Sequence, residues 1–167
     1  WERLKAANLR VFFASRHGLD SYYDANFQQQ IQWQGVRLEF PHVFLPGAKT
    51  RDLGARLDCP EVLDAMEEYD PDIVLVYGYA QPLQRRVMAW AKANKKSLVL
   101  IGDSELHQLR PILRKLAKRV VLPRVLRKVD MFLTVGDSNE AYYRSYGVPD
   151  DKMIRTCFPI DIEMFDE

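Results

Sequence analysis

Short apolar runs alternate with longer amphipathic segments along most of the chain. Five runs have the length and the β-branched or aromatic content of strands, and they cover residues 9–14, 72–77, 98–101, 131–135 and 153–157. Between the second and third runs, apolar residues recur at helical spacing, with Leu83, Val87, Trp90 and Ala91 in one stripe. Strands that alternate with helices predict βαβ units, so we expect an α/β fold in which all five strands form one parallel sheet.

The first third of the chain has a weaker pattern. Residues 15–30 contain Gly, Asp, Asn and three consecutive glutamines without a clear period, which predicts a long, partly ordered loop. Residues 36–45 predict a short, irregular strand, interrupted by Pro41. The sequence Asp58-Cys59-Pro60-Glu61 predicts the start of a helix that ends before Pro71.

Ligand-binding positions are expected where the central strands end. Gly78-Tyr79 and Gly102-Asp103-Ser104 follow two consecutive strands, and ligands of open α/β sheets bind outside the carboxyl ends of the strands. A second Gly-Asp-Ser sequence, Gly136-Asp137-Ser138, follows a later strand, and Glu140 is placed to complete a capping box with Asp137. Plain helix capping is the alternative reading of both Gly-Asp-Ser sequences, and it suits the second better than the first.

Several other chemistries fit the chain less well. A serine esterase would use Ser104 with a histidine base, but the only downstream histidine is His107, three residues away on the same segment. The glycine spacing of nicotinamide, flavin and P-loop sites does not occur. The three histidines and two cysteines are too scattered for a metal site or a disulfide framework, so we expect no metal.

The net charge of +1 conceals a strongly basic segment between Glu105 and Asp130, which holds eight Lys and Arg residues and no acid. Apolar residues at helical spacing predict an amphipathic helix over 107–122, interrupted at Pro123 and followed by a short basic turn. Its charged side is readily interpreted as a solvated face. No nucleic-acid-binding motif accompanies the charges, so we expect no nucleic acid partner.

No apolar run reaches the length of a membrane span and no signal peptide opens the chain, so we expect a cytoplasmic location.

The order of these sequences resembles a known family. The resemblance is carried in turn by Tyr77-Gly78-Tyr79, a basic crossover helix, Gly102-Asp103-Ser104-Glu105, and residues 129–136, 139–149 and 159–165. Together they resemble the amino-terminal half of family 4 glycosyltransferases of the GT-B class. Residues 23–27 and Ile31-Gln32-Trp33 are similar to one subgroup of that family, so the resemblance covers nearly the whole chain.

The resemblance implies a Rossmann-like three-layer α/β sandwich with a mostly parallel sheet. Residues 1–158 would form the acceptor-side domain without its first strand, and residues 159–167 would begin the linker to a donor-binding domain. The whole enzyme would move a sugar, with retention, from a nucleotide-sugar donor to a glycan or lipid-linked acceptor, without a cofactor. The catalytic groups are expected mainly in the second domain, so this segment alone is expected to be inactive.

The resemblance also assigns residues to roles. The acceptor side of the cleft would be lined by Gly78, Tyr79, Gly102, Asp103, Ser104 and Gly136, with Asp103 bonding a sugar or acceptor hydroxyl. Related enzymes with lipid-linked acceptors bind anionic membranes through basic helices of this domain, which here implies Arg114, Lys115, Lys118 and Arg119 at the inner face of a membrane. The alternative is a non-catalytic α/β binding or interaction module, because a crevice at a sheet edge does not by itself fix a function.

Overall fold

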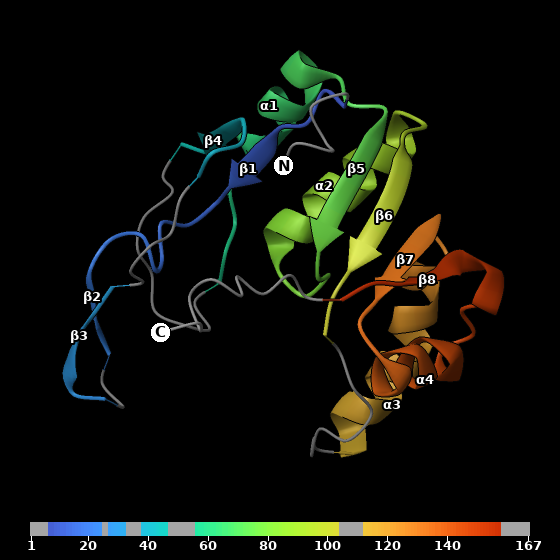
Figure 1. The fold of residues 1–167 in the computed structure, drawn as a ribbon. Coiled ribbons are helices and arrows are strands. Elements are labelled where there is room, and N and C mark those ends of the chain that lie inside the picture. The colour runs from blue at the N-terminus through green and yellow to red at the C-terminus, as the bar shows by residue number, and fades with distance from the viewer. Residues whose placement is uncertain (1–6, 25–26, 33–37, 47–55, 104–111, 158–167) are drawn as a thin grey trace. The chain divides into compact units, whose positions relative to one another are not determined.

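The computed structural model describes residues 7–24, 27–32, 38–46, 56–103 and 112–157, with the backbone alone for residues 112–117. The chain divides into two compact units, residues 1–68 and 69–167. Figure 1 shows the elements of both units. The prediction of one domain over residues 1–158 stays a prediction, and the two units are described separately below.

The first unit contains two small sheets and one helix. Strands β1 (Val11–Phe13) and β4 (His42–Phe44) pair in parallel, while β2 (Tyr22–Asp24) and β3 (Gln29–Ile31) form an antiparallel hairpin. Helix α1 (Val62–Tyr69) follows and ends where it was predicted to end. This hairpin lies where a loop was predicted for residues 15–30. The hydrophobic pattern did not indicate it, because each strand is only three residues long and neither shows an apolar alternation.

The prediction that residues 9–14 join one sheet with the later strands is wrong. Strand β1 pairs only with β4 among the described strands. The two strands are held by aromatic packing, since the rings of Phe13 and Phe44 stack with their centroids 5.3 Å apart. His42 packs edge-on against both rings and so adds to the aromatic packing of the pair.

The second unit has a Rossmann-like α/β fold, as predicted. Its elements in chain order are β5 (Ile73–Tyr77), α2 (Pro82–Ala93), β6 (Ser97–Ile101), α3 (Ile112–Leu126), β7 (Met131–Thr134), α4 (Asp137–Ser145), the 3₁₀ turn η2 (Asp150–Lys152) and β8 (Met153–Arg155). The four strands lie in the order β5-β6-β7-β8, and every neighbouring pair is parallel. The prediction of a parallel sheet is therefore confirmed for its last four strands.

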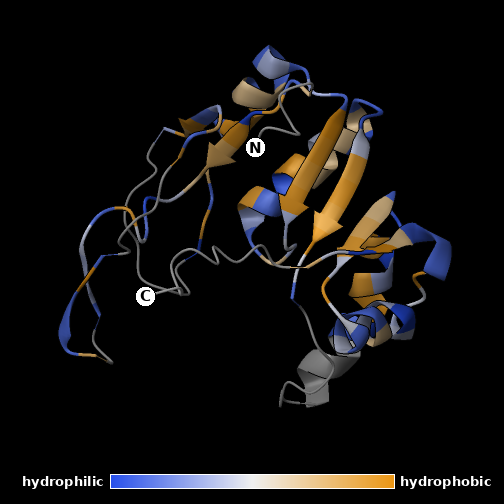
Figure 2. Cartoon of the chain, viewed as in Figure 1, coloured by the Kyte–Doolittle hydropathy of each residue, from blue (hydrophilic) through white to orange (hydrophobic). Residues whose placement is uncertain are grey.

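One face of this sheet carries the core. The side chains of this face are buried on each of the first three strands; they are Val74, Val76, Leu98, Leu100, Phe132 and Thr134. Strands in sequential order with right-handed crossovers place all their helices on one face, and α2 lies against β5 and β6 (Figure 1). On β5 the alternate positions, Ile73, Leu75 and Tyr77, are exposed although their side chains are apolar or aromatic. Figure 2 accordingly shows β5 and β6 as largely hydrophobic.

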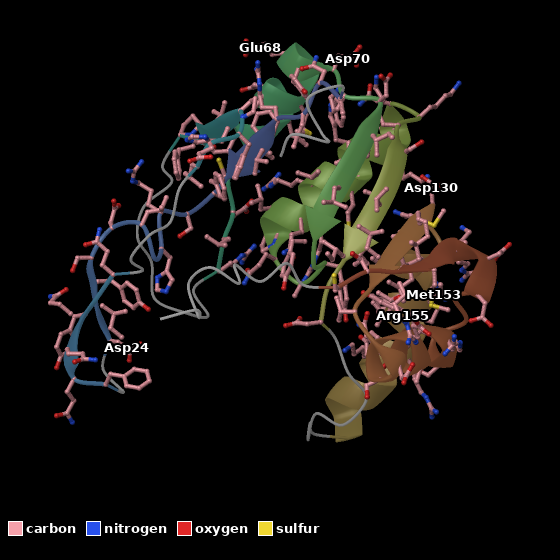
Figure 3. The ribbon with its side chains drawn as sticks, viewed as in Figure 1. Asp24, Glu68, Asp70, Asp130, Met153 and Arg155 are labelled. Atoms are coloured by element: carbon pink, nitrogen blue, oxygen red, sulfur yellow. The ribbon has the colours of Figure 1, made fainter. Side chains whose placement is uncertain are left out.

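The amino edge of the sheet is tied together by Asp130, which is labelled in Figure 3. Its carboxylate accepts two bonds of 2.8 Å from Nζ of Lys92 on α2, and a third of 2.8 Å from the backbone N–H of Leu98. Asp130 therefore links the start of β7 to the start of β6 and to α2. The bonds to Lys92 and Leu98 outweigh partial burial, so the pKa of this carboxyl lies below its ordinary value.

Helix α3 differs from the prediction at its carboxyl end. It runs through Pro123 to Leu126 instead of stopping at the proline. Leu122 and Leu126, one turn apart on either side of Pro123, are both buried, so core packing holds the helix across the missing N–H. Val120 is one of the apolar residues at helical spacing that predicted this helix, and it is 58% exposed. The predicted start over residues 107–111 lies outside the described residues. No helix in the described ranges is long and apolar enough to cross a membrane.

The alternation of the sheet makes a direct stability prediction. Leu100→Ala would empty a fully buried position and lower the free energy of unfolding by about 2–5 kcal/mol. Leu75→Ala, at an exposed position of the adjacent strand, is the matched control and should cost less than about 1 kcal/mol. Urea unfolding of both variants measures the difference, and equal losses would contradict the assignment of the buried face.

Candidate functional site

Strand register brings two predicted positions together at the carboxyl edge of the sheet. Tyr77 of β5 pairs with Ile101 of β6, so Gly78 and Gly102 are the next residues on adjacent strands. The backbone N–H of Gly78 donates to the carbonyl of Ile101 over 2.7 Å. Both loops that were expected to bind a ligand therefore start from the same point.

The turn after β5 depends on glycine. Gly78 has a φ of +77°, a conformation that side chains with a Cβ rarely adopt. The Gln84 side chain closes the turn by donating to the Tyr77 carbonyl and accepting from the Gln81 N–H over 2.8 Å. A Cβ at Gly78 would lie 3.1 Å from Nε2 of Gln84, so both the backbone and this amide favour glycine. The turn therefore fixes the backbone position of Tyr79, the next residue.

A group of tyrosines surrounds the end of this turn. The hydroxyls of Tyr79 and Tyr142 share a short hydrogen bond, which joins the β5–α2 loop to α4. Tyr146 packs on Tyr142, with ring centroids 5.0 Å apart. Nζ of Lys118, from α3, lies 4.8 Å from the ring centroid of Tyr142 and 6.0 Å and 5.9 Å from those of Tyr79 and Tyr146. Three segments of the second unit thus meet around one ammonium group, and we call these four residues the tyrosine–lysine cluster.

Tyr143 adds a buried hydroxyl beside this cluster. Its side chain is fully buried, and a Cβ built on Gly102 would lie 3.6 Å from its hydroxyl. That hydroxyl has no hydrogen-bond partner of good geometry among the described residues, although the Asn139 side chain is near enough to lower its pKa. Burial and then the neighbouring Tyr79 raise the pKa of Tyr143 to about 12, so the group remains a protonated donor at neutral pH.

Asp103 brings a carboxylate to the same edge. It is exposed and makes no hydrogen bond or ion pair within the described part of the chain. Its negative charge adds to burial in raising the pKa values of Tyr77 and Tyr143, which places it near both phenols. The site therefore combines a free carboxylate, which accepts hydrogen bonds, with a buried hydroxyl that can donate one.

The second Gly-Asp-Ser sequence serves α4, and the predicted capping box between Asp137 and Glu140 is wrong. The N-cap residue of α4 is Gly136, and no side-chain hydrogen bond caps this end of the helix. The Glu140 carboxylate instead accepts from Thr134 Oγ1 over 3.1 Å, Arg155 Nε over 2.7 Å and Arg144 Nη2 over 3.1 Å. Arg155 also pairs with Asp137 (Figure 3 labels Arg155). Stronger donors on β7 and β8 thus outcompete the helix end for Glu140.

The predicted acceptor residues divide into three groups. Gly78, Tyr79, Gly102 and Asp103 come together at the carboxyl edge, while Ser104 lies outside the described residues. Gly136 begins α4, and a Cβ there would meet nothing within 4 Å, so no close contact requires glycine.

The predicted membrane residues divide differently. Arg114 and Lys115 have side chains outside the described part, and Arg119 is exposed. Lys118 is half-buried against the tyrosine rings.

Sequence reasoning missed Tyr142, Tyr143 and Tyr146 as members of the site. The signal was present, because residues 142 and 146 are one helical turn apart on the helix that follows a central strand. Without the position of α3, however, the three tyrosines are also typical of a core stripe, and Tyr142 and Tyr143 are in fact buried.

The arrangement suits binding of a polar ligand more than nucleophilic or metal chemistry. No group of three or more His, Cys, Asp or Glu residues suitable for a metal ion occurs among the residues described. Cys59 and Cys157 are free thiols, and burial raises the pKa of Cys59 above its ordinary value, which disfavours the thiolate. Comparison of the chain with family models, curated proteins and solved structures found no significant match. The function is therefore inferred from the site itself.

The Glu140 network predicts a pH-dependent contribution to stability. The bond from Arg155 and those from Thr134 and Arg144 lower the pKa of Glu140 from 4.5 to about 2. Its contribution is then fully present above pH 4.5 and is lost as the pH falls toward 2. Glu140→Gln should lower the melting temperature at pH 7 and flatten its fall between pH 5 and pH 2. The exposed Asp151→Asn is the control, and a variant with the parent's pH profile would contradict the network's role.

The unpartnered hydroxyl of Tyr143 makes a separate prediction. Tyr143→Phe should leave the free energy of unfolding within about 0.5 kcal/mol of the parent, because the hydroxyl makes no hydrogen bond of good geometry within the described part of the chain. Thr134→Val, which removes a buried hydroxyl bonded to Glu140 and to the Ile154 carbonyl, should cost about 1–3 kcal/mol. Chemical denaturation of both variants gives the comparison. A large loss in Tyr143→Phe would mean that a protein group already uses this hydroxyl.

Proposed function

We propose that this chain is the acceptor-binding half of a retaining glycosyltransferase of the GT-B class. The observation that supports this most is a pair of polar groups at the carboxyl edge of the parallel sheet that lack a well-placed partner among the described residues. The Asp103 carboxylate can accept a hydrogen bond from one hydroxyl of a saccharide, and the buried Tyr143 hydroxyl can donate one to another. The adjoining Tyr79 ring supplies an aromatic surface of the kind on which the apolar face of a sugar packs.

In this proposal the site positions the acceptor. A retaining transfer requires the developing charge of the nucleoside diphosphate to be stabilised and the acceptor hydroxyl to be held close to the anomeric carbon. Asp103 accepts a hydrogen bond from an acceptor hydroxyl, which orients its oxygen toward the donor. Gly78 and Gly102 allow this approach because neither adds a side chain at the strand ends. The nucleotide sugar and the groups that stabilise its diphosphate belong to the second domain of the proposed enzyme.

The proposal includes work at the inner face of a membrane. Helix α3 supports this, because Val120 and Val121 are 58% and 57% exposed and lie between the basic residues Arg119 and Arg124. Exposed aliphatic side chains beside cationic ones are typical of helices that lie in the interface of an anionic membrane. The enzyme would then be bound to the same membrane surface that holds a lipid-linked acceptor.

Substitution of Asp103 tests the proposal. In the protein encoded by the complete reading frame, Asp103→Asn should lower kcat/KM for the acceptor by about 10–100-fold, because a charge-assisted hydrogen bond is replaced by a weaker one. The measurement is nucleotide release and product formation with a panel of nucleoside diphosphate sugars and saccharide acceptors.

Asp72→Asn is the matched control, since it makes the same charge change before the start of β5, at the opposite edge of the sheet. It should leave kcat/KM within about twofold of the parent. Absence of transfer with every donor would contradict the proposed glycosyltransferase activity and favour the alternative, a non-catalytic binding module. Equal activity of Asp103→Asn and the parent would contradict the role of Asp103.

A further inference from the structure

Lys118 is a half-buried cation without an anionic partner among the described residues. Its ammonium group lies against the rings of Tyr79, Tyr142 and Tyr146, the nearest centroid 4.8 Å away. It forms no ion pair or hydrogen bond with any residue that the structure describes. Ring faces attract a cation but leave its three N–H donors without strong acceptors. Charged groups partly withdrawn from water are normally paired, so this ammonium points to an anion that the described residues do not supply.

The surroundings of Lys118 restrict where an anion could bind. The contacts with the tyrosine rings restrict the ammonium, which reduces the freedom that a lysine side chain loses when it binds. The Tyr79 and Tyr142 hydroxyls already share a hydrogen bond, so Lys118 is the principal charged donor of the cluster. The Asp103 carboxylate would repel an anion beside it, which favours the hydroxyl-bearing part of a ligand there.

We infer that the ligand of this site carries an oxyanion, of which phosphate is the best match, and that the ammonium of Lys118 binds it. Lysine binds phosphate as a point charge and requires no planar geometry, which suits a group held by ring faces. The inference rests on the proposed function in one respect, namely that this ligand is the acceptor. The acceptor would then be a phosphorylated saccharide or a lipid-linked one, and both present the same phosphate chemistry.

Phosphate titration of the 167-residue chain tests this inference. Inorganic phosphate should shift the ring resonances of Tyr79, Tyr142 and Tyr146, and Lys118→Gln should weaken the apparent affinity by about tenfold or more. Lys118→Arg keeps the charge and the ring contacts and should stay within about threefold of the parent. Lys128→Gln, which removes an exposed charge just beyond α3, is the control for net charge and should leave binding unchanged. Melting temperatures check that each variant is folded.

A second arm separates the two sources of phosphate. Sedimentation with vesicles of phosphatidylcholine and phosphatidylglycerol, compared with phosphatidylcholine alone, reports binding to a lipid headgroup. Loss of phosphate binding or of vesicle binding in Lys118→Gln, but not in Lys128→Gln, supports the inference. The assay in which the loss occurs identifies the source of the phosphate. Absence of both, or binding that is equal in Lys118→Gln and Lys128→Gln, overturns it.

The two proposals can fail separately. If phosphate does not bind but Asp103→Asn still impairs transfer, the acceptor is neutral and the proposed function stands. If phosphate binds through Lys118 but the full-length protein releases no nucleotide from any donor, the oxyanion site stands and the enzyme does not.

Discussion

The in-register pairing of β5, β6 and β7 is the constraint on which the candidate site depends. Val76, Leu100 and Phe132 are aligned across the three strands and buried on one face. A slip of one residue between two strands would turn these side chains to the opposite face, so burial fixes the register strongly. The same register sets Gly78 beside Gly102 at the carboxyl edge. Core packing in the sheet thus determines which loops can share a ligand.

The polar groups at the two edges of the sheet fall into two classes with different physical roles. The carboxylates of Asp130 and Glu140 are saturated by donors from neighbouring elements and fasten helices to the sheet. Asp103, Lys118 and Tyr143 have no such partners among the described residues, although two of them are partly or fully buried. Buried polar groups are rarely left unpaired without a reason, and binding of a polar ligand is the one that this location favours.

The sequence predicted the parts of the fold that local pattern controls. Apolar runs of four to six residues and a helical stripe were sufficient for the four-stranded parallel sheet and α2, and the Gly78 and Gly102 loops followed from strand ends. The partner of β1 could not be predicted, because pairing with β4 depends on contacts between Phe13 and Phe44, which are 31 residues apart in the printed sequence. Glu140 was assigned to a cap because its competition for Arg155 is a tertiary interaction. Lys118 was placed on a cationic face for the same reason, since its ring contacts come from α4 and the β5–α2 loop.

A crystal structure of the chain grown with glucose 1-phosphate would test the central claim most directly, namely that the unpartnered groups at the carboxyl edge form one ligand site. The account predicts the phosphate within hydrogen-bond distance of Lys118 Nζ and a sugar hydroxyl bonded to Asp103 or to the Tyr143 hydroxyl. A structure in which Lys118 pairs with a protein carboxylate, and in which Asp103 and Tyr143 are bonded to other protein groups with no ligand between them, would contradict it.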